Sequence, residues 1–225
     1  MVMNWNRLPW VLALGSVIAL TSVVAYGAPV GNPASVESRG PPVQLNADQI
    51  AIQRAAVLAQ AGRSAMSYIG AAQHGIDSKD TKLAEKYLQT ARDILDQMQG
   101  VLASTAATGN EDLVPIFGRV GIGEDVKVTD ELKGKLHALE PHMLKGEHDK
   151  VLEGLRAAGI DASYTYVDLP LANTMAQVKL ALAALKSGKV EAVDKAIDAA
   201  NGGLVTETVK VGMTLKKKEG LQTHS

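Results

Sequence analysis

Length, composition and charge already limit what this chain of 225 residues is. It carries 23 Lys and Arg against 24 Asp and Glu, so its formal net charge is −1, and it contains no cysteine. A charge so close to zero does not favour nucleic acid or an anionic membrane as a partner. Without cysteine there is no disulfide, no thiol chemistry and no cysteine-linked lipid anchor, so we expect packing or assembly to stabilise the protein.

The first 27 residues have the layout of a secretory signal peptide. Arg7 provides a positive start, residues 10–24 form an apolar run without charge, and residues 25–27 form a small-x-small cleavage site. A membrane-spanning helix needs roughly 20 apolar residues, which is longer than this run. We expect cleavage after Gly27 and export to the periplasm, with an uncleaved anchor as the alternative.

The remaining chain divides by composition into three parts. Residues 28–45 are rich in Pro, Gly and Ser and predict a disordered tether. Residues 46–212 predict a single helix-rich domain. Residues 213–225 predict a flexible tail with the basic run 216–218, which is either solvated or weakly attracted to lipopolysaccharide or anionic lipid.

The first part of the domain predicts an antiparallel helical hairpin. Asn46 and Gln49 have the spacing of a capping box, and apolar residues then recur with helical period up to an expected end at Gly75. A second helix is predicted from near Asp80 to Gly100. The connection is short, so the two helices should pack antiparallel.

Extended segments and an interrupted helix follow. Residues 114–120 and 126–128 are rich in β-branched residues and predict short strands, with Pro115 confining the first to a sheet edge. Another helix should begin at residues 129–132. Pro141 should break it near Glu140.

The last third contains an internal repeat. Residues 144–158 match residues 185–200, and each copy consists of a leucine, a turn glycine and an amphipathic helix. Each leads into a stretch of alternating polarity, 162–167 and 204–211, which predicts a half-buried strand. A helix over residues 171–185 should form a second hairpin with the second copy. The predicted fold is therefore mainly α (α+β), with antiparallel helical hairpins and a small β element.

No segment carries a catalytic signature. The glycines of residues 118–123 are followed neither by a dinucleotide-type helix nor by Gly-Lys-Ser/Thr, and a Gly-x-Ser-x-Gly motif does not occur. We therefore expect turn or bulge glycines there. No catalytic, cofactor-binding or metal-binding residue and no cofactor are expected, and an enzymatic activity is not favoured.

One histidine-rich stretch has metal-ligand residue types without a metal-ligand spacing. It comprises His137, Glu140, His142, Glu147 and His148. Zinc needs three or four converging ligands, and this spacing fits no helical metal motif. A solvated polar surface is favoured, with pH sensing by the three histidines as the sharper hypothesis.

The alternating segment 162–167 offers a second candidate site. Tyr164, Tyr166 and Asp168 are candidate contacts for a ligand or a client protein. Asp161 and Asp168 could point into a cleft as paired carboxylates, although helix capping is the simpler expectation for both.

Several short motifs of the last third carry a family resemblance. They are Ala157–Asp161, Val167–Leu171, Thr174, Val178, Leu185–Gly188, Ala192, and Ala199 with Ala200 running on to Gly203. With them, the segment from Gly146 to Val211 resembles the YfdX family of bacterial proteins, and weaker similarity extends back to Asn46. The resemblance implies an exported, mainly helical, oligomeric protein linked to acid, envelope or antibiotic stress, with chaperone-like behaviour. It implies no catalytic residue.

Three functional hypotheses follow. The first is an exported, non-enzymatic, stress-associated protein that acts as a homo-oligomer on unfolded or envelope protein clients, without nucleic acid and without a membrane segment after cleavage. The second is a periplasmic small-molecule-binding protein or enzyme with a cleft near Tyr164 and Tyr166. The third is a purely structural module.

Overall fold

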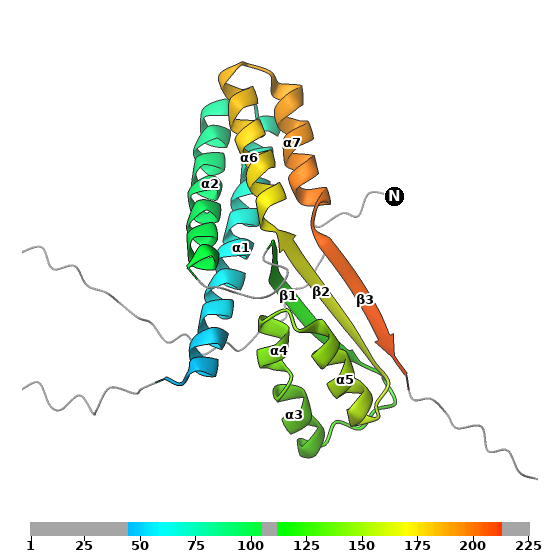
Figure 1. The fold of residues 1–225 in the computed structure, drawn as a ribbon. Helices are drawn as coiled ribbons and strands as arrows, with labels where there is room; N and C mark the ends of the chain where they lie inside the picture. The colour runs from blue at the N-terminus through cyan, green and yellow to red at the C-terminus, as the bar shows by residue number, and fades with distance from the viewer. Residues whose placement is uncertain (1–44, 105–111, 213–225) are drawn as a thin grey trace, which may run out of the picture. The chain divides into compact units, whose positions relative to one another are not determined.

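The computed structural model describes residues 45–104 and 112–212 (Figure 1). The predicted signal peptide, the tail over 213–225 and the tether up to residue 44 lie outside these residues. Leu45, the last residue of the predicted tether, is described and is 40% exposed. Within the described residues, no helix combines the length and the apolar character that a membrane span requires.

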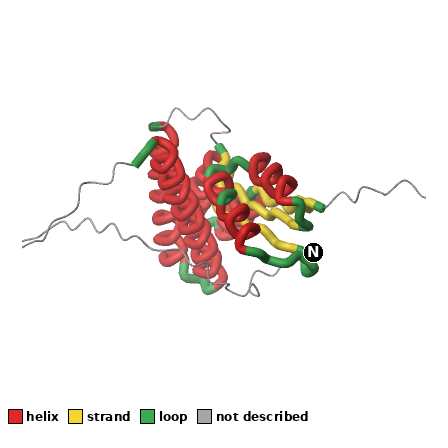
Figure 2. Tube along the Cα trace, turned by 90° about the horizontal axis from the view of Figure 1, so that it is seen from below, coloured by secondary structure: helices red, strands yellow, loops and turns green. Residues whose placement is uncertain are grey.

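Four helices form the larger part of the fold. They are α1 (Ala47–Asp77), α2 (Thr81–Ala103), α6 (Leu171–Lys186) and α7 (Val190–Gly202). α1 packs against α2 and α6 against α7, while α2 contacts α6 and α1 contacts α7, so the four close into one bundle (Figures 1 and 2). Both predicted hairpins are confirmed.

Small and branched apolar side chains fill the core of this bundle. Ala65, Ile69 and Ala72 of α1 and Leu88 and Leu95 of α2 are all 0% exposed. Burial of this apolar stripe stabilises both helices.

Gly75 and Gly100 are not helix ends, contrary to the sequence prediction. α1 continues to Asp77 and α2 to Ala103. A Cβ atom on Gly75 would lie 3.0 Å from the backbone nitrogen of Ala84, so this glycine allows α1 and α2 to approach closely. A glycine inside a helix contact and a glycine after a helix end look alike in a sequence.

The first three turns of α1 have no partner in the core. The capping box is confirmed, because the Asn46 side chain accepts from the Gln49 amide at 2.8 Å and the Gln49 side chain accepts from the Asn46 amide at 3.0 Å. The first buried residue of α1 is nevertheless Leu58. Ile50 and Val57 are 44% and 61% exposed, so apolar side chains of this helix end face solvent.

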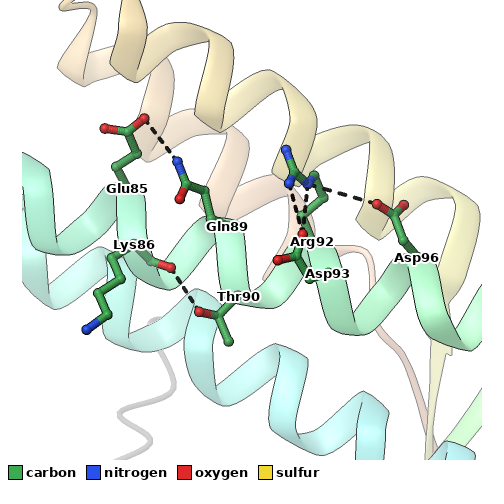
Figure 3. Close-up of polar contacts among 7 residues, drawn as sticks. All are labelled: Glu85, Lys86, Gln89, Thr90, Arg92, Asp93 and Asp96. Atoms are coloured by element: carbon green, nitrogen blue, oxygen red, sulfur yellow. Dashed lines mark hydrogen bonds and ion pairs between the residues drawn. The ribbon is translucent and has the colours of Figure 1, made fainter.

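The outer surface of α2 is polar instead (Figure 3). Arg92 forms ion pairs with Asp93 at 2.9 Å and Asp96 at 3.9 Å. Gln89 donates to Glu85, and the Thr90 hydroxyl donates to the Lys86 carbonyl. This face is the solvated side of an amphipathic helix.

Three antiparallel strands form one sheet in the order β1-β2-β3. They are β1 (Leu113–Ile122), β2 (Ala162–Pro170) and β3 (Val205–Val211). β1 is an edge strand with a register irregularity between Pro115 and Phe117, which confirms the expected edge position of Pro115. Residues 126–128 are not a strand. β3 is predicted to be half-buried, but Val211 is its single buried residue, because β3 is the other edge.

Three short helices cover one face of the sheet. They are α3 (Asp130–His137), α4 (Glu140–Leu144) and α5 (His148–Ala158), and Figure 1 shows them beside the strands. Of the three, α4 also contacts α1 of the bundle. The break between α3 and α4 confirms the predicted effect of Pro141. A second, smaller core joins this layer to the sheet and consists of Leu139, Val151, Leu155, Ala162, Tyr164 and Val211.

The internal repeat corresponds to two helix–strand units, α5–β2 and α7–β3. Gly146 and Gly188 precede the two helices with φ of 70° and 67°, a left-handed conformation that favours glycine. The two strands pair with each other, but the two helices pack differently. α5 lies on the sheet, whereas α7 belongs to the bundle.

Candidate functional site

Four side chains from α5 and β2 meet on the covered face of the sheet. Tyr164, Tyr166 and Asp168 lie on this face because side chains alternate along a strand. His148 is the first residue of α5 and faces them. We call these four residues the His148 cluster. The sequence identified all four as candidates but did not place them together.

The His148 ring contacts each of the other three members. It stacks on the Tyr166 ring with a centroid distance of 3.7 Å and an interplanar angle of 13°. Its Nδ1 lies 2.9 Å from the Tyr164 hydroxyl oxygen, and its Nε2 lies 3.0 Å from Oδ2 of Asp168. The side chains of His148 and Asp168 are 18% and 6% exposed, so this chain of hydrogen bonds is largely shielded from water.

The network assigns the protons when His148 is neutral. Asp168 accepts from Nε2–H, and Nδ1 accepts from the Tyr164 hydroxyl, so every nitrogen and the phenolic proton have a partner. In the imidazolium form Nδ1 also donates, and the Tyr164 proton then needs another acceptor. The cluster is therefore sensitive to the protonation state of His148.

Both tyrosines remain neutral at physiological pH. Burial, together with the nearby Asp168 carboxylate, raises the pKa of Tyr164 to about 12. Burial, followed by the Glu207 carboxylate to which the Tyr166 hydroxyl donates, raises the pKa of Tyr166 as well. These phenols serve as hydrogen-bond donors, and their raised pKa disfavours the phenolate that a tyrosine nucleophile would need.

Asp168 is the most unusual member of the cluster. It is 5% exposed, and its Oδ1 is a buried acceptor without a hydrogen-bond partner among the described residues. Asp161 is exposed and precedes β2, at the opposite end of the strand from Asp168, so the alternative of a carboxylate pair is wrong. Helix capping, the simpler expectation for both residues, is also wrong, because α5 ends at the C-cap Gly159 and Pro170 occupies the N-cap of α6.

A second polar group surrounds Glu147 at the start of α5. Its carboxylate contacts the His142 ring, Lys145 at 3.3 Å and Lys150 at 3.1 Å. Burial opposes the charged form, but the hydrogen bonds from His142, Lys150 and Lys145 outweigh it and lower the pKa of Glu147 to about 2. Glu147 thus joins α4 to α5.

The histidine-rich stretch therefore separates into three places. His137 pairs with Glu140 at 3.0 Å on an exposed surface, where the two side chains are 80% and 57% exposed. His142 belongs to the Glu147 group, and His148 to the tyrosines. In the part of the chain that the structure describes, no three His, Cys, Asp or Glu residues are placed to hold a metal ion. The pH-sensing hypothesis for the three histidines stays a prediction.

The sequence analysis missed Glu207. It lies on β3 directly opposite Tyr166, so it reaches the cluster through strand pairing across 41 residues of chain. The alternation of residues 204–211 indicated a strand, but no local signal fixed its register. The glycines of residues 118–123 lie mainly in β1 rather than in a phosphate-binding loop.

Access to the cluster is restricted. Tyr164 is 0% exposed and its hydroxyl is engaged by His148, so a small molecule could contact Tyr166 but not Tyr164 without moving α5. The hypothesis that Tyr164 contacts a ligand stays a prediction that requires such a movement.

Comparison with known proteins identifies a family and a matching solved structure. A family model described as "YfdX protein" matches residues 65–210. A solved structure of Salmonella Typhi YfdX is 20% identical, with a TM-score of 0.45, and the match covers 68% of this chain and 91% of that chain. No curated protein matches this chain.

Proposed function

This chain belongs to the YfdX family, and we propose that it is an exported, non-enzymatic, stress-associated protein that binds unfolded segments of other proteins and acts as an oligomer. Export rests on the signal-peptide layout of the first 27 residues. Stress association rests on the family. Binding of unfolded chains rests on apolar surface that the described fold leaves open.

The exposed start of α1 is the observation that carries this proposal. Ile50 and Val57 are seven residues apart, so they lie on nearly the same side of the helix, and both face solvent. Residues 47–57 contain no buried side chain. A helix end of this length gains little stability on its own, which favours contact with a client or a second copy.

The outer edge of β3, which has no strand partner among the described residues, is a second supporting feature. Pro115 and the neighbouring irregularity blunt the β1 edge, whereas β3 contains no proline and no register shift. Val205 on this strand is 41% exposed. An extended client segment can add to such an edge through backbone hydrogen bonds.

Suppression of aggregation tests the proposal. The double variant Ile50→Asp/Val57→Asp should lose the ability of the processed protein to suppress light scattering by a denatured client diluted into buffer. Leu180→Asp is the matched control, because Leu180 is 58% exposed on α6. Equal activity of wild type and the double variant would contradict the role of α1, and an inactive wild type would contradict the chaperone function.

Two further measurements address assembly and export. Size-exclusion chromatography with light scattering should give a mass above that of one chain, and a monomer would contradict the oligomer. Both tryptophans, Trp5 and Trp10, lie in the predicted signal peptide. Protein recovered from the periplasm should therefore show no tryptophan emission, and strong emission would mean that the segment is retained.

A further inference from the structure

The backbone groups along the outer edge of β3 can be assigned residue by residue. The Gly123 amide donates to the Asp161 carbonyl at 2.9 Å, which continues the pairing of β1 with β2 one residue beyond Ile122. Hydrogen-bonded and non-hydrogen-bonded pairs alternate along antiparallel strands, so the backbone of Ala162 points away from β1 and towards Val211 on β3. The same alternation turns the amide and carbonyl groups of three β3 residues away from the sheet: Thr206, Thr208 and Lys210.

These outward groups form an edge to which an extended chain can bind. β2 lies on one side of β3, and no further strand pairs with β3 among the described residues (Figure 1). The three residues that point outward are exposed, and β3 contains neither a proline nor a register shift. The edge therefore offers three backbone donors and three backbone acceptors to a partner strand.

The side chains of β3 place opposite charges on the two faces of this edge. Glu207 lies on the same face as Tyr166, whose hydroxyl donates to it. Lys210 lies on the other face together with Thr208, whose hydroxyl oxygen is 2.8 Å from that of Thr165. Among the described residues, neither Glu207 nor Lys210 forms an ion pair. Both charges can therefore contact a chain that binds along this edge.

We propose that the β3 edge binds extended client segments in which an acidic residue is followed, three positions later, by a basic residue. The client should run antiparallel to β3, because both existing strand pairs of the sheet are antiparallel and parallel pairing is less stable. In that direction the client residue opposite Lys210 comes first, and the one opposite Glu207 follows three positions later. This inference rests on the proposed client binding and names the class of segment that the site selects.

The spacing of three also satisfies the geometry of a strand. Side chains alternate between faces, so two client residues three positions apart point to opposite faces, as Glu207 and Lys210 do. Each client charge then lies directly across from a β3 residue of opposite charge. Direct cross-strand pairs of opposite charge stabilise an antiparallel pair, and like charges destabilise it.

A second copy of this chain fits the same edge less well. Two identical edges that meet about a two-fold axis form one continuous sheet, in which each face continues into the same face of the partner. Glu207 and Lys210 lie on opposite faces, so neither meets its counter-charge in that arrangement. An unfolded segment is not attached to another sheet, so it can present either side to each face. The charges therefore favour a client segment over self-association at β3.

Two peptides of equal composition test this preference. The matched peptide, Val-Glu-Val-Thr-Lys-Thr-Val, places its Glu opposite Lys210 and its Lys opposite Glu207 when it runs antiparallel to β3. The exchanged peptide, Val-Lys-Val-Thr-Glu-Thr-Val, places like charges at both positions. Each peptide is capped, labelled with a fluorophore and titrated with the processed protein in low-salt buffer, and fluorescence anisotropy gives the dissociation constant.

The matched peptide should bind about 2- to 30-fold more tightly than the exchanged peptide, which is the affinity that two direct charge pairs supply. Lys210→Glu should reduce this preference, and the double variant Glu207→Lys/Lys210→Glu should reverse it. Each preference is a ratio measured on one protein, so it does not depend on the stability of the variant. Equal affinity of the two peptides for the wild-type protein, or an unreversed preference in the double variant, would overturn the proposal.

Hydrogen exchange locates the bound peptide on the protein. Saturation with the matched peptide should slow exchange about tenfold at the outward amides of Thr206, Thr208 and Lys210, while the amides of Glu207 and Val209, which bond to β2, change little. Protection confined to other elements would overturn the proposal. Protection of the outward amides that rises with protein concentration without peptide would assign the edge to a second copy, and it would overturn the proposal as well.

The peptide titration and the aggregation assay fail in different ways. A processed protein that does not suppress aggregation contradicts the chaperone function, whatever its peptide affinities are. A protein that suppresses aggregation but binds both peptides equally leaves the proposed function intact and refutes the selectivity of β3.

Discussion

Replacing Tyr164 by phenylalanine tests whether the His148 cluster stabilises the fold through its hydrogen bonds. The change keeps the ring that fills the small core and removes the hydroxyl that donates to Nδ1 of His148 at 2.9 Å. The His148 side chain is only 18% exposed, so Nδ1 would lose its donor with little access to water. An unsatisfied buried acceptor costs about 1–2 kcal/mol, which for a domain of this size lowers Tm by about 2–8 °C.

The same variant should also alter stability in alkali. The pKa of Tyr164 is raised from 10 to about 12, so the folded state holds this proton more tightly than the unfolded state. Its contribution is complete below pH 10 and is lost as the pH rises to about 12, and it amounts to at most about 3 kcal/mol. Wild type should lose this contribution between pH 10 and pH 12, whereas Tyr164→Phe has none to lose.

Urea unfolding followed by circular dichroism at pH 8 and pH 11 measures both effects. Tyr87→Phe on α2 is the control, because its ring pairs with Tyr68 within the bundle and lies outside the cluster. The reasoning would be refuted if Tyr164→Phe had the wild-type midpoint at pH 8 and lost the same free energy of unfolding by pH 11.

Three further substitutions at α1 test helix propensity, helix–helix packing and N-capping one at a time. Gly70→Ala should raise the free energy of unfolding by about 0.5–1 kcal/mol in a thermal melt, since a Cβ there meets no atom within 4 Å and alanine favours a helix. Gly75→Ala should instead lower it by about 1–3 kcal/mol, because the new Cβ presses on the backbone of Ala84, and a stabilised variant would disprove the close approach of α1 and α2. Asn46→Ala should lower the local stability of the first turn of α1 by about 1 kcal/mol. Because no residue of α1 before Leu58 is buried, that loss should appear as about fivefold faster amide exchange in the first turns and not as a lower Tm.

The bundle and the layer of α3–α5 on the sheet contribute different groups to the fold. The bundle supplies stability from apolar packing, while the smaller layer on the sheet carries the shielded titratable groups. The His148 cluster connects α5 to β2 through ring stacking and two hydrogen bonds. The urea experiment with Tyr164→Phe measures how much this connection stabilises the fold.

Features that depend on neighbouring residues could be predicted from the sequence. The capping box of Asn46 and Gln49, the break at Pro141 and the positive φ of Gly146 and Gly188 follow from local chemistry. The helical period identified both hairpins, because one apolar face of each helix has to be buried. The edge position of Pro115 followed from its missing amide proton.

Features that depend on distant residues were decided by the tertiary structure alone. His148 reaches Tyr164 and Asp168 only because α5 folds back over β2, and Glu207 joins through the pairing of β2 with β3. The histidine-rich stretch is contiguous in the sequence. The turn between α4 and α5 nevertheless places His142 beside Glu147 and His148 beside Tyr164. A sequence states which side chains can donate, accept or carry charge, whereas strand register and helix packing determine which of them meet.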